Sequence, residues 1–573
     1  MADEFDELLA TGSPLPGQPA LPPGAVTIPA APGGERAFGA FDGAKRFDAT
    51  IANWQPRLQS ADQDIIPEKP IDDARARDIL RNDSYVQGGQ QLHKDNIVGS
   101  QFILNAKPAT RVLLGTNDDV WEGEFQEEVE ELFDLAADSP DNLFDAAGVN
   151  TFTDLIRLAT GIHVAAGEVL ATVEWVRDGR PFNTAIQMVD LDRLQTPPLM
   201  LNDSQVRAGV KRDVRGKPIS YFIRKTHPND YLPFFAFADV LEQYREVPAA
   251  TKWGRKQVIH LFEQQRPDQT RGVAAMVAAL KEMHITKRFR DVTLQNAVAQ
   301  ALYAATITSD LPSEAIMQML GGQTDADAFQ RVFTEYAVGY MQTVDQFAGA
   351  SRNLKTDGVR IPHLLPGTKL DLTSPGKDGK IGMEFEQSLL RYIAATLGVS
   401  YEQLSRDYTN TNYSSARAAM SETWKFMLAQ KKIIADRFAT IIYRLWLEEM
   451  VNANALTTFP KARAVELYTN GRLNMKFDAL TRCDWIGASR GQIDELKETQ
   501  AAKLRVDAGF STRETEISRL GGDWRKIFRQ QARENAMAES LGLVFSQPDP
   551  SMMNAVAGAA TPTDSPNPDG AKV

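Results

Sequence analysis

The sequence of 573 residues contains a single cysteine, Cys483, so no disulfide can form within the chain. A chain without disulfides suits a reducing cytoplasm. Because Cys483 stands beside Asp484 and Trp485, we expect it to be a small buried hydrophobic side chain and not a catalytic thiol. No apolar run approaches the length that crosses a bilayer. The N-terminus is acidic and rich in proline, which predicts neither a secretory signal nor a transit peptide.

The motifs that carry common chemistry are also missing. The sequence has no Gly-x-x-x-x-Gly-Lys-[Ser/Thr] phosphate loop, no His-Glu-x-x-His or Cys-x-x-Cys spacing and no Gly-x-Ser-x-Gly elbow. We therefore expect neither an ATPase nor another enzyme, and no cofactor. Two or three histidines could still converge in space, but their separation in the sequence predicts no metal site. The six are His93, His163, His227, His260, His284 and His363.

Positive charge is in short supply, because 63 Lys and Arg face 75 Asp and Glu, a net charge of −12. Tight wrapping of nucleic acid needs cations against phosphate, so this balance argues against it. It does not argue against a channel through which DNA slides, since a passage that gripped phosphate strongly would stall the polymer. An acidic chain with a few placed cations is compatible with a conduit.

The most regular stretch of the chain lies between Gly398 and Pro460, where neither residue type recurs. Its apolar residues fall on one face of a helix: Met420, Trp424, Met427, Ile434, Phe438, Ile441 and Leu445. A helix from Ser414 to Val451 would be roughly 57 Å long at about 1.5 Å per residue. A polar segment rich in Asn, Thr and Tyr precedes it. A rigid rod led by a polar loop favours an architectural role, although periodicity alone fits a long core helix equally well.

Other segments have clear local patterns. Helices are predicted for 72–81, 85–97, 120–137, 152–161, 273–308, 384–397, 492–508, 511–520 and 523–537. Strands are predicted for 168–176, 185–189, 219–223 and 257–262. The helix at 120–137 carries a run of glutamates that we expect to face solvent. Ser511 and Glu514 have the spacing of a capping box.

Three segments, in this order along the chain, resemble the portal proteins of tailed bacteriophages of the lambda type. The first is Asp78-Ile-Leu-Arg-Asn-Asp-Ser-Tyr85 leading to His93-Lys-Asp-Asn-Ile-Val-Gly99. The second is Ser400-Tyr-Glu-Gln-Leu404 followed by Thr411-Asn-Tyr-Ser-Ser-Ala-Arg417. The third is Cys483-Asp-Trp-Ile-Gly487 followed by Ile493-Asp-Glu-Leu-Lys-Glu498. The resemblance covers about residues 60 to 540.

The resemblance implies an α+β, mostly helical portal fold that assembles as a ring. The expected regions are a disordered arm (1–60), an α/β wing (61–271), a first stem helix (272–309), a clip (310–381), a second stem helix (382–398), a tunnel loop (399–413), a long wing helix (414–455), a return to the wing (456–488), a helical crown (489–546) and a disordered tail (547–573). Family members can lose a short N-terminal piece during head maturation, but no protease site is identifiable here.

The same resemblance assigns residues to a DNA channel. The tunnel-loop residues are Arg406, Asp407, Tyr408, Thr409, Asn410, Thr411 and Asn412. In a ring, the loop's only cation and only acid would each form a ring of charge, and its Asn and Thr offer sequence-blind hydrogen bonds to phosphate. The stem cations are Lys281, Lys287, Arg288 and Arg290. They either touch phosphate weakly or form salt bridges between subunits.

The implied protein is a non-enzymatic portal, a homo-oligomer of roughly twelve copies at one capsid vertex. Double-stranded DNA would pass through it without sequence specificity. The implied partners are the terminase, head-completion and tail connector proteins, the major capsid protein and the scaffold. The implied locations are the virion and, during assembly, the host cytoplasm. Two alternatives remain open: a DNA-processing enzyme such as a nuclease or terminase subunit, and a minor capsid adaptor without a channel.

Overall fold

A computed structural model describes residues 56–228, 243–302, 379–409, 411–491 and 495–543, with a few isolated positions outside these ranges. The chain divides into Met1–Ser60 and Ala61–Val573, and the account below concerns the second unit. Almost all of the predicted arm and clip, and the whole of the predicted tail, lie outside the described residues. None of the helices searched, which belong to the described part, is long and apolar enough to span a membrane.

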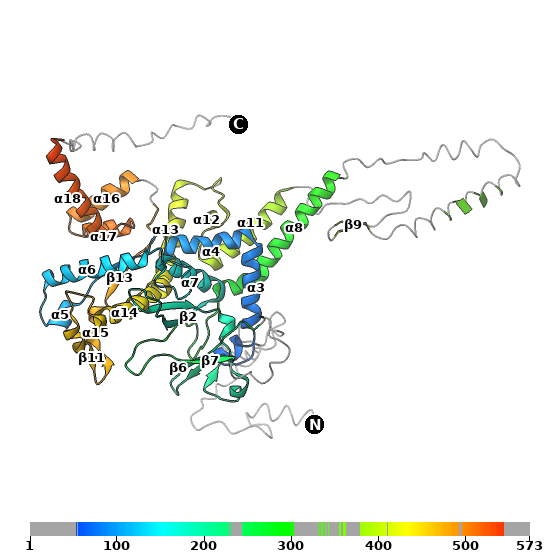
Figure 1. The fold of residues 1–573 in the computed structure, drawn as a ribbon. Helices are drawn as coiled ribbons and strands as arrows, with labels where there is room; N and C mark the ends of the chain where they lie inside the picture. Colours follow the sequence, from blue (N-terminus) through cyan, green and yellow to red (C-terminus); the bar gives the residue numbers. More distant parts are fainter. Residues whose placement is uncertain are drawn as a thin grey trace, which may run out of the picture. The chain divides into compact units, whose positions relative to one another are not determined.

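The described residues form a mixed and mostly helical fold (Figure 1). The helices are α2 (Ala61–Ile65), α3 (Lys69–Asn82), α4 (Ser84–Ile97), α5 (Thr110–Leu114), α6 (Asp119–Ala137), α7 (Phe152–Ala166), α8 (Leu280–Leu302), α11 (Gly379–Leu397), α12 (Tyr401–Ser405), α13 (Tyr413–Gln430), α14 (Asp436–Ala453), α15 (Met475–Leu480), α16 (Glu495–Asp507), α17 (Arg513–Arg519) and α18 (Trp524–Leu541). Short 3-10 turns cover Leu191–Arg193, Pro198–Met200, Ala275–Ala279 and Lys461–Leu467.

The strands are short, and every pair of them is antiparallel. They are β1 (Ile103–Ala106), β2 (Glu168–Trp175), β3 (Thr184–Met188), β4 (Val206–Arg207), β5 (Val210–Arg212), β6 (Pro218–Arg224), β7 (Tyr244–Pro248), β8 (Val258–Phe262), β9 (Leu354–Thr356), β10 (Val359–Ile361), β11 (Tyr468–Thr469), β12 (Arg472–Leu473) and β13 (Cys483–Ile486). The two larger sheets have the orders β3-β2-β8 and β4-β5-β6-β7.

Strand β2 is the centre of the three-stranded sheet. Its first six residues are buried, as expected for a run of β-branched and apolar side chains covered on both faces. Val169 pairs with Leu261 of β8, and Val173 pairs with Ile186 of β3. The polar group at its start, Glu168, is buried with them and becomes important below.

An aromatic core joins segments that are far apart in the sequence. Phe133 of α6 lies at its middle, with ring centroids 5.0 Å from Phe152 of α7 and 5.2 Å from Trp446 of α14. Trp485 of β13 completes the cluster, 5.4 Å from Phe152. Strand β13 in turn pairs with β1, with Leu104 opposite Trp485. Residues near 480 therefore complete a core whose other members come from much earlier in the chain.

The predicted rod is one nearly continuous helix, built from α13, a π-helical segment at Lys431–Ala435, and α14. The rod ends at Asn454, which adopts a left-handed conformation. Its two halves differ in burial. Among its described side chains, α13 buries only Thr423 and Met427, whereas most of α14 is buried. The half formed by α14 is therefore a core helix, whereas the half formed by α13 leaves most of its described side chains at least partly exposed.

Most predicted elements are found, with corrections at their ends. The helix predicted at 152–161 continues to Ala166 and stops at Gly167, which has a φ of 75°. The helix predicted from residue 273 begins at Leu280, after a 3-10 turn. The predicted capping box is wrong: Thr512, and not Ser511, caps α17 by accepting a hydrogen bond from the Thr515 amide. Cys483 is half-buried beside the core, and burial raises the pKa of its thiol to about 11, so it stays protonated.

Candidate functional site

The tunnel loop predicted at 399–413 contains a short helix, α12, and only the residues after it, from Arg406 to Asn412, connect α12 to α13. A capping box of Ser400 and Gln403 starts α12, and Arg406 ends it in a left-handed conformation with a φ of 57°. At the other end, Asn412 caps α13, since its side-chain oxygen accepts the Ser415 amide at 2.8 Å. The turn between these caps is short and defined at both ends.

The loop residues differ in whether their polar side chains already have hydrogen-bond partners within the loop. The Asp407 carboxylate accepts hydrogen bonds from the amide and the hydroxyl of Thr409, which lower its pKa. Asn412 is committed to its cap. Arg406 is exposed and Tyr408 is 53% exposed, and the described residues offer neither a side-chain hydrogen-bond partner. Asn410 lies outside the described residues, and the Thr411 amide donates to the Tyr408 carbonyl at 3.2 Å.

Helices α8 and α11, the two predicted stem helices, pack against each other (Figure 1). Phe289 of α8 meets Phe385 of α11 edge to face, with ring centroids 5.5 Å apart. Several of their apolar side chains nevertheless stay in solvent, for example Val292 at 56% and Tyr392 at 65% exposure. The helix pair thus has more apolar surface than the described part of the chain covers.

The four cations assigned to the stem have different surroundings. Lys281 and Arg288 are exposed, Lys287 is half-buried, and none of these three forms an ion pair within the described chain. Arg290 differs, because its guanidinium pairs with Asp83 and lies 4.8 Å from the centroid of the Tyr85 ring. We had expected either DNA contacts or salt bridges between subunits, but Arg290 is held within its own chain.

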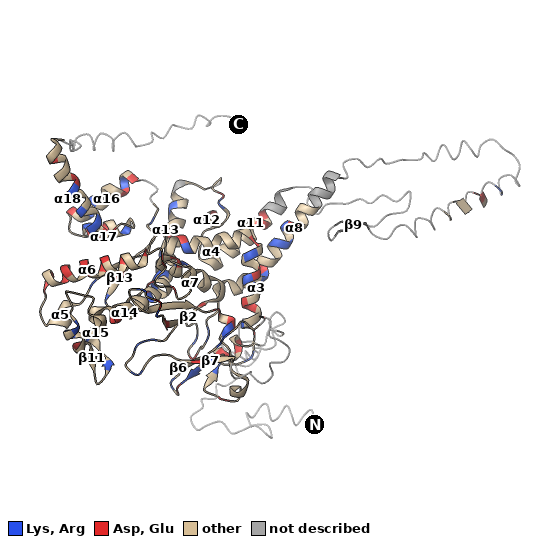
Figure 2. Ribbon diagram, in the orientation of Figure 1, with Lys and Arg blue, Asp and Glu red and all other residues tan. Residues whose placement is uncertain are grey.

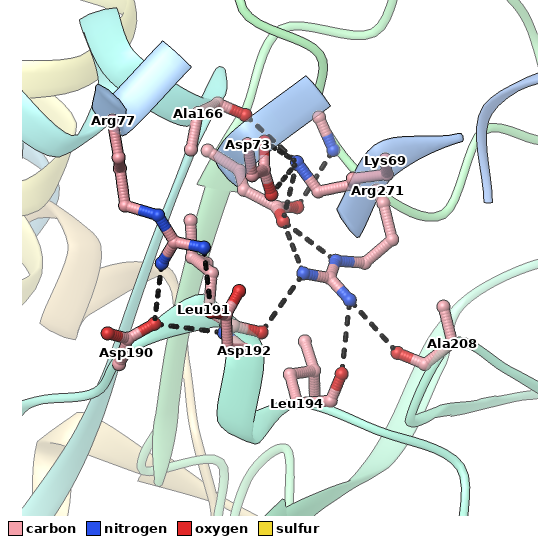
Figure 3. A network of polar contacts seen from close by, with 12 residues as sticks. Lys69, Asp73, Arg77, Ala166, Asp190, Leu191, Asp192, Leu194, Ala208 and Arg271 are labelled. Atoms are coloured by element: carbon pink, nitrogen blue, oxygen red, sulfur yellow. Dashed lines mark hydrogen bonds and ion pairs between the residues drawn. The ribbon is translucent and has the colours of Figure 1, made fainter. Parts of the chain in front are cut away.

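A buried ion network anchors the start of the α8 segment (Figure 3). Glu168, at the first position of β2, has no exposed side-chain surface. Arg271 reaches it at 2.6 Å, and Lys69 of α3 at 3.3 Å. Its other oxygen accepts the Gly272 amide at 2.8 Å and contacts His260 Nε2 at 3.0 Å.

The network is electrostatically balanced. Burial alone would raise the pKa of Glu168, but Arg271, Lys69 and His260 hold it well below its usual value. Lys69 also pairs with Asp73 at 3.1 Å, and burial raises the pKa of Asp73 to about 6. Because Arg271 and Gly272 immediately precede the 3-10 turn into α8, this network fixes where that helix leaves the sheet.

The glutamate run of α6 faces solvent only in part, because Glu122, Glu128 and Glu130 are half-buried while the other three glutamates are exposed. In Figure 2 the acidic residues of α6 appear as red stretches of its ribbon, and basic residues appear in blue on α18. Four ion pairs connect the two helices: Arg525 with Glu130 at 3.2 Å, Lys526 with Asp134 at 2.5 Å, Arg529 with Glu131 at 3.0 Å, and Arg529 with Glu127. The sequence did not predict these pairs, because the complementary cations lie about 400 residues away along the chain. The acidic run is a docking surface for the C-terminal helices.

Among the residues that the structure describes, one group of metal-ligand type converges in space, namely Asp190, Asp192 and His227. Arg77 already pairs with Asp192 at 2.7 Å and with Asp190 at 3.6 Å (Figure 3). A guanidinium in this position neutralises the carboxylates that a metal ion would need. The group is therefore an ion-pair cluster that joins α3 to the Leu191–Arg193 turn.

The comparisons with known proteins can now be set against this geometry. Residues 47–431 match the model of the phage portal protein family, lambda type. The chain belongs to the lambda family of phage portal proteins. The portal protein of Escherichia phage N15 is 34% identical over 506 residues, which cover 88% of this chain and 91% of that protein. Portal protein B of Escherichia phage lambda is 33% identical with the same coverage.

A solved structure is also similar, a chain from the neck of a native gene transfer agent particle. It is 12% identical and covers 80% of this chain and 99% of that chain, with a TM-score of 0.35. A score this low supports no conclusion about this portal protein. Its family membership comes from the sequence relatives.

Sequence reasoning missed the buried ion network that precedes α8 in this portal protein. Neither Glu168 nor Arg271 was singled out, because each sits in an ordinary local pattern. A charged residue at the start of an otherwise apolar strand was the one available signal. Such a residue is almost never fully buried unless it is paired, but its partners, Lys69 and Arg271, cannot be found from spacing.

Proposed function

We propose that this portal protein assembles into a closed ring of roughly twelve copies at one capsid vertex, and that double-stranded DNA enters and leaves through the axis. Membership of the portal family is the observation that carries the proposal. The paired α8 and α11, followed by the polar turn at 406–412 and the α13 half of the rod, support it. In this proposal α8 and α11 form the stem, and the turn projects toward the axis.

The channel would act by shape and by weak electrostatics. Arg406, repeated around the ring, would place one cation per subunit at the narrowing, with Tyr408 beside it as an exposed aromatic ring. Asp407, Thr409 and Asn412 would mainly maintain the shape of the turn, since their polar groups are already used locally. Sparse cations let the polymer slide, because DNA affinity rises steeply with the number of phosphates neutralised.

The four stem cations also divide into those whose charge is free to contact DNA and one whose charge is paired within the subunit. Lys281 and Arg288 are exposed on one face of α8, so they are the better candidates for contact with phosphate, with Lys287 less accessible. Arg290 would instead fix α8 to Asp83 of the wing. We assign Arg290 a structural role within the subunit and leave the other three as channel residues.

Ring closure requires a head-to-tail interface between two different surfaces of the chain. The exposed apolar side chains of α8 and α11, among them Val292 and Tyr392, would be covered by the neighbouring copy. Isolated exposed apolar residues are common, but a row of them along two packed helices favours a partner. The α13 half of the rod would be covered in the same way.

The remaining regions would serve as docking surfaces. The clip at 310–381 would face the terminase during packaging and the head-completion and tail connector proteins afterwards. The crown at 489–546 would face the capsid interior, and the wing would meet the major capsid protein and the scaffold. The protein would act without catalysis, in the virion and, during assembly, in the host cytoplasm.

Electron microscopy of the purified chain tests the proposal directly. We expect rings with an axial hole and a sedimenting mass of about 760 kDa for roughly twelve copies of the 63.4-kDa chain. A strictly monomeric protein under all conditions would contradict the ring. An oligomer without a hole would favour a capsid adaptor, and metal-dependent DNA cleavage by the pure protein would favour an enzyme.

The narrowing can be tested separately with the double substitution Arg406→Ala and Asp407→Ala. We expect ring assembly to persist and retention of packaged DNA to fall, measured as DNA protected from nuclease in filled heads. Lys425→Ala is the matched control, because it removes an exposed cation from the rod beyond the loop. Normal packaging and retention in the double variant would refute the role of the loop.

A further inference from the structure

A basic cavity lies on the buried half of the rod, away from the proposed channel. It has a volume of about 350 Å³ and is lined by α14, the π-helical segment, the 254–256 turn before β8, and residues from β12 and α15. Five of its lining residues are cations: Arg255, Lys256, Lys432, Arg437 and Arg444. Only two acids, Asp436 and Glu448, line it with them.

The two acids are already neutralised. Asp436 pairs with Lys431 at 2.6 Å and with Lys432 at 3.5 Å. Glu448 pairs with Arg255 at 2.8 Å, and both side chains are buried. Neither acid has charge left to offset the other cations of the cavity.

Among the remaining cations of the cavity, Arg444 has an ion-pair partner, whereas Lys256 and Arg437 have none among the described residues. Arg444 pairs with Asp478 at 2.6 Å and lies against the Phe477 ring. Lys256 and Arg437 form no ion pair or hydrogen bond with any side chain in the described ranges. Both side chains are exposed to solvent at the cavity. Partial desolvation and the nearby charges of Arg437 and Arg444 nevertheless lower the pKa of Lys256, as expected when cations gather without enough counter-charge.

We propose that this cavity binds a compact phosphate oxyanion, with Lys256 and Arg437 as its principal ligands and Arg444 beside them. Guanidinium groups donate paired hydrogen bonds to phosphate oxygens, and an ammonium adds a point charge. A phosphate carries about two negative charges, which suits two unpaired cations better than the single charge of a carboxylate. The buried apolar side chains of Ile441 and Phe477 also line the cavity.

The position separates this site from the channel. Arg437 follows Asn412 by 25 residues along the rod, a distance of roughly 37 Å at about 1.5 Å per residue. A phosphate at this site is therefore not one that the loop holds. The site could take a free phosphate compound or the backbone of a nucleic acid, and the experiment distinguishes these two sources.

The test is calorimetric titration of the full chain with pyrophosphate in a dilute chloride buffer, and with a short DNA duplex in a second arm. We expect the double substitution Lys256→Ala and Arg437→Ala to weaken pyrophosphate binding by at least about tenfold, because two charge-assisted hydrogen bonds are lost. Lys252→Ala is the matched control: it removes an exposed lysine from the same turn but outside the cavity, and should leave binding unchanged.

Each outcome decides the proposal. Pyrophosphate binding that a DNA duplex displaces supports a nucleic-acid backbone as ligand, and binding that a duplex does not displace supports a free phosphate compound. The proposal is overturned if the parent chain does not bind pyrophosphate, if the double variant binds it as well as the parent, or if an oligoglutamate peptide binds more tightly. Should the double variant not fold, the single change Arg437→Gln provides the same comparison.

Discussion

Replacing Glu168 by Gln should strongly destabilise the region around β2. The substitution keeps the size of the side chain and one carbonyl oxygen, but it removes the charge that Arg271 and Lys69 share. Lys69 would keep Asp73 as a partner. Arg271 would keep only backbone carbonyls, such as that of Leu194 at 3.2 Å.

The burial of the network sets the size of the effect. Glu168 has no exposed side-chain surface, and the side chains of Arg271 and Lys69 are 7% and 6% exposed. Breaking a buried ion pair by removing one partner typically costs about 3–5 kcal/mol, because the remaining charge is left without compensation. Domains of this kind are stable by only about 5–15 kcal/mol, so the loss should be plain.

Urea unfolding of the parent and the variant measures the difference. Glu174→Gln is the matched control, because its partner Arg245 is 55% exposed and such surface pairs contribute only about 0–1 kcal/mol. The pKa of Glu168 is lowered in the folded state, so its contribution is complete above its usual pKa of 4.5 and is lost as the pH falls toward the folded value. The gap between parent and variant should therefore narrow in acid. A loss below about 1 kcal/mol at neutral pH would refute the reasoning.

Three further substitutions test other contacts. Gly398→Ala should destabilise the protein at the α11–α12 connection by about 2–4 kcal/mol, measured by urea unfolding. The position has a φ of 66°, and the new Cβ would lie 2.4 Å from the Phe426 ring. An unchanged unfolding midpoint would contradict this contact. Arg529→Ala should lower stability by less than about 1 kcal/mol, because its partner Glu131 is 64% exposed, and the effect should disappear in about 1 M salt; a salt-independent loss would mean that packing, and not charge, holds α18. Thr512→Ala should reduce the stability of the C-terminal helices by about 1 kcal/mol, seen as a lower midpoint in thermal circular dichroism; no change would show that the cap is dispensable.

Local patterns predicted the elements well where the chain's own neighbours decide the structure. The rod was predicted from apolar spacing and the lack of glycine and proline between Gly398 and Pro460. The strand at 168–176 was predicted from its β-branched run. The capping box at Ser511 was wrong by one position, because Ser511 and Thr512 both offer a hydroxyl and the sequence does not select between them.

Function was predictable only through resemblance. Three short segments in order identified the portal family, and the relatives confirm it. No spacing of residues predicted a channel by itself. The roles of the loop at 406–412 and of the α8 cations remain proposals. The structure leads us to propose a different role for Arg290 alone among these cations, because it pairs with Asp83 of its own chain.

By itself the sequence determined the helices, the strands, the polar turn before the rod and the family, because periodicity, capping residues and short motifs are properties of neighbouring residues. Only the tertiary structure decided which charges are satisfied. It buried Glu168 among Arg271 and Lys69, and it paired acids of α6 with cations of α18. It also left Lys256 and Arg437 without a counter-charge in one cavity. Electrostatic partners are chosen by distance in space, and residues that meet there can be hundreds of positions apart in the chain.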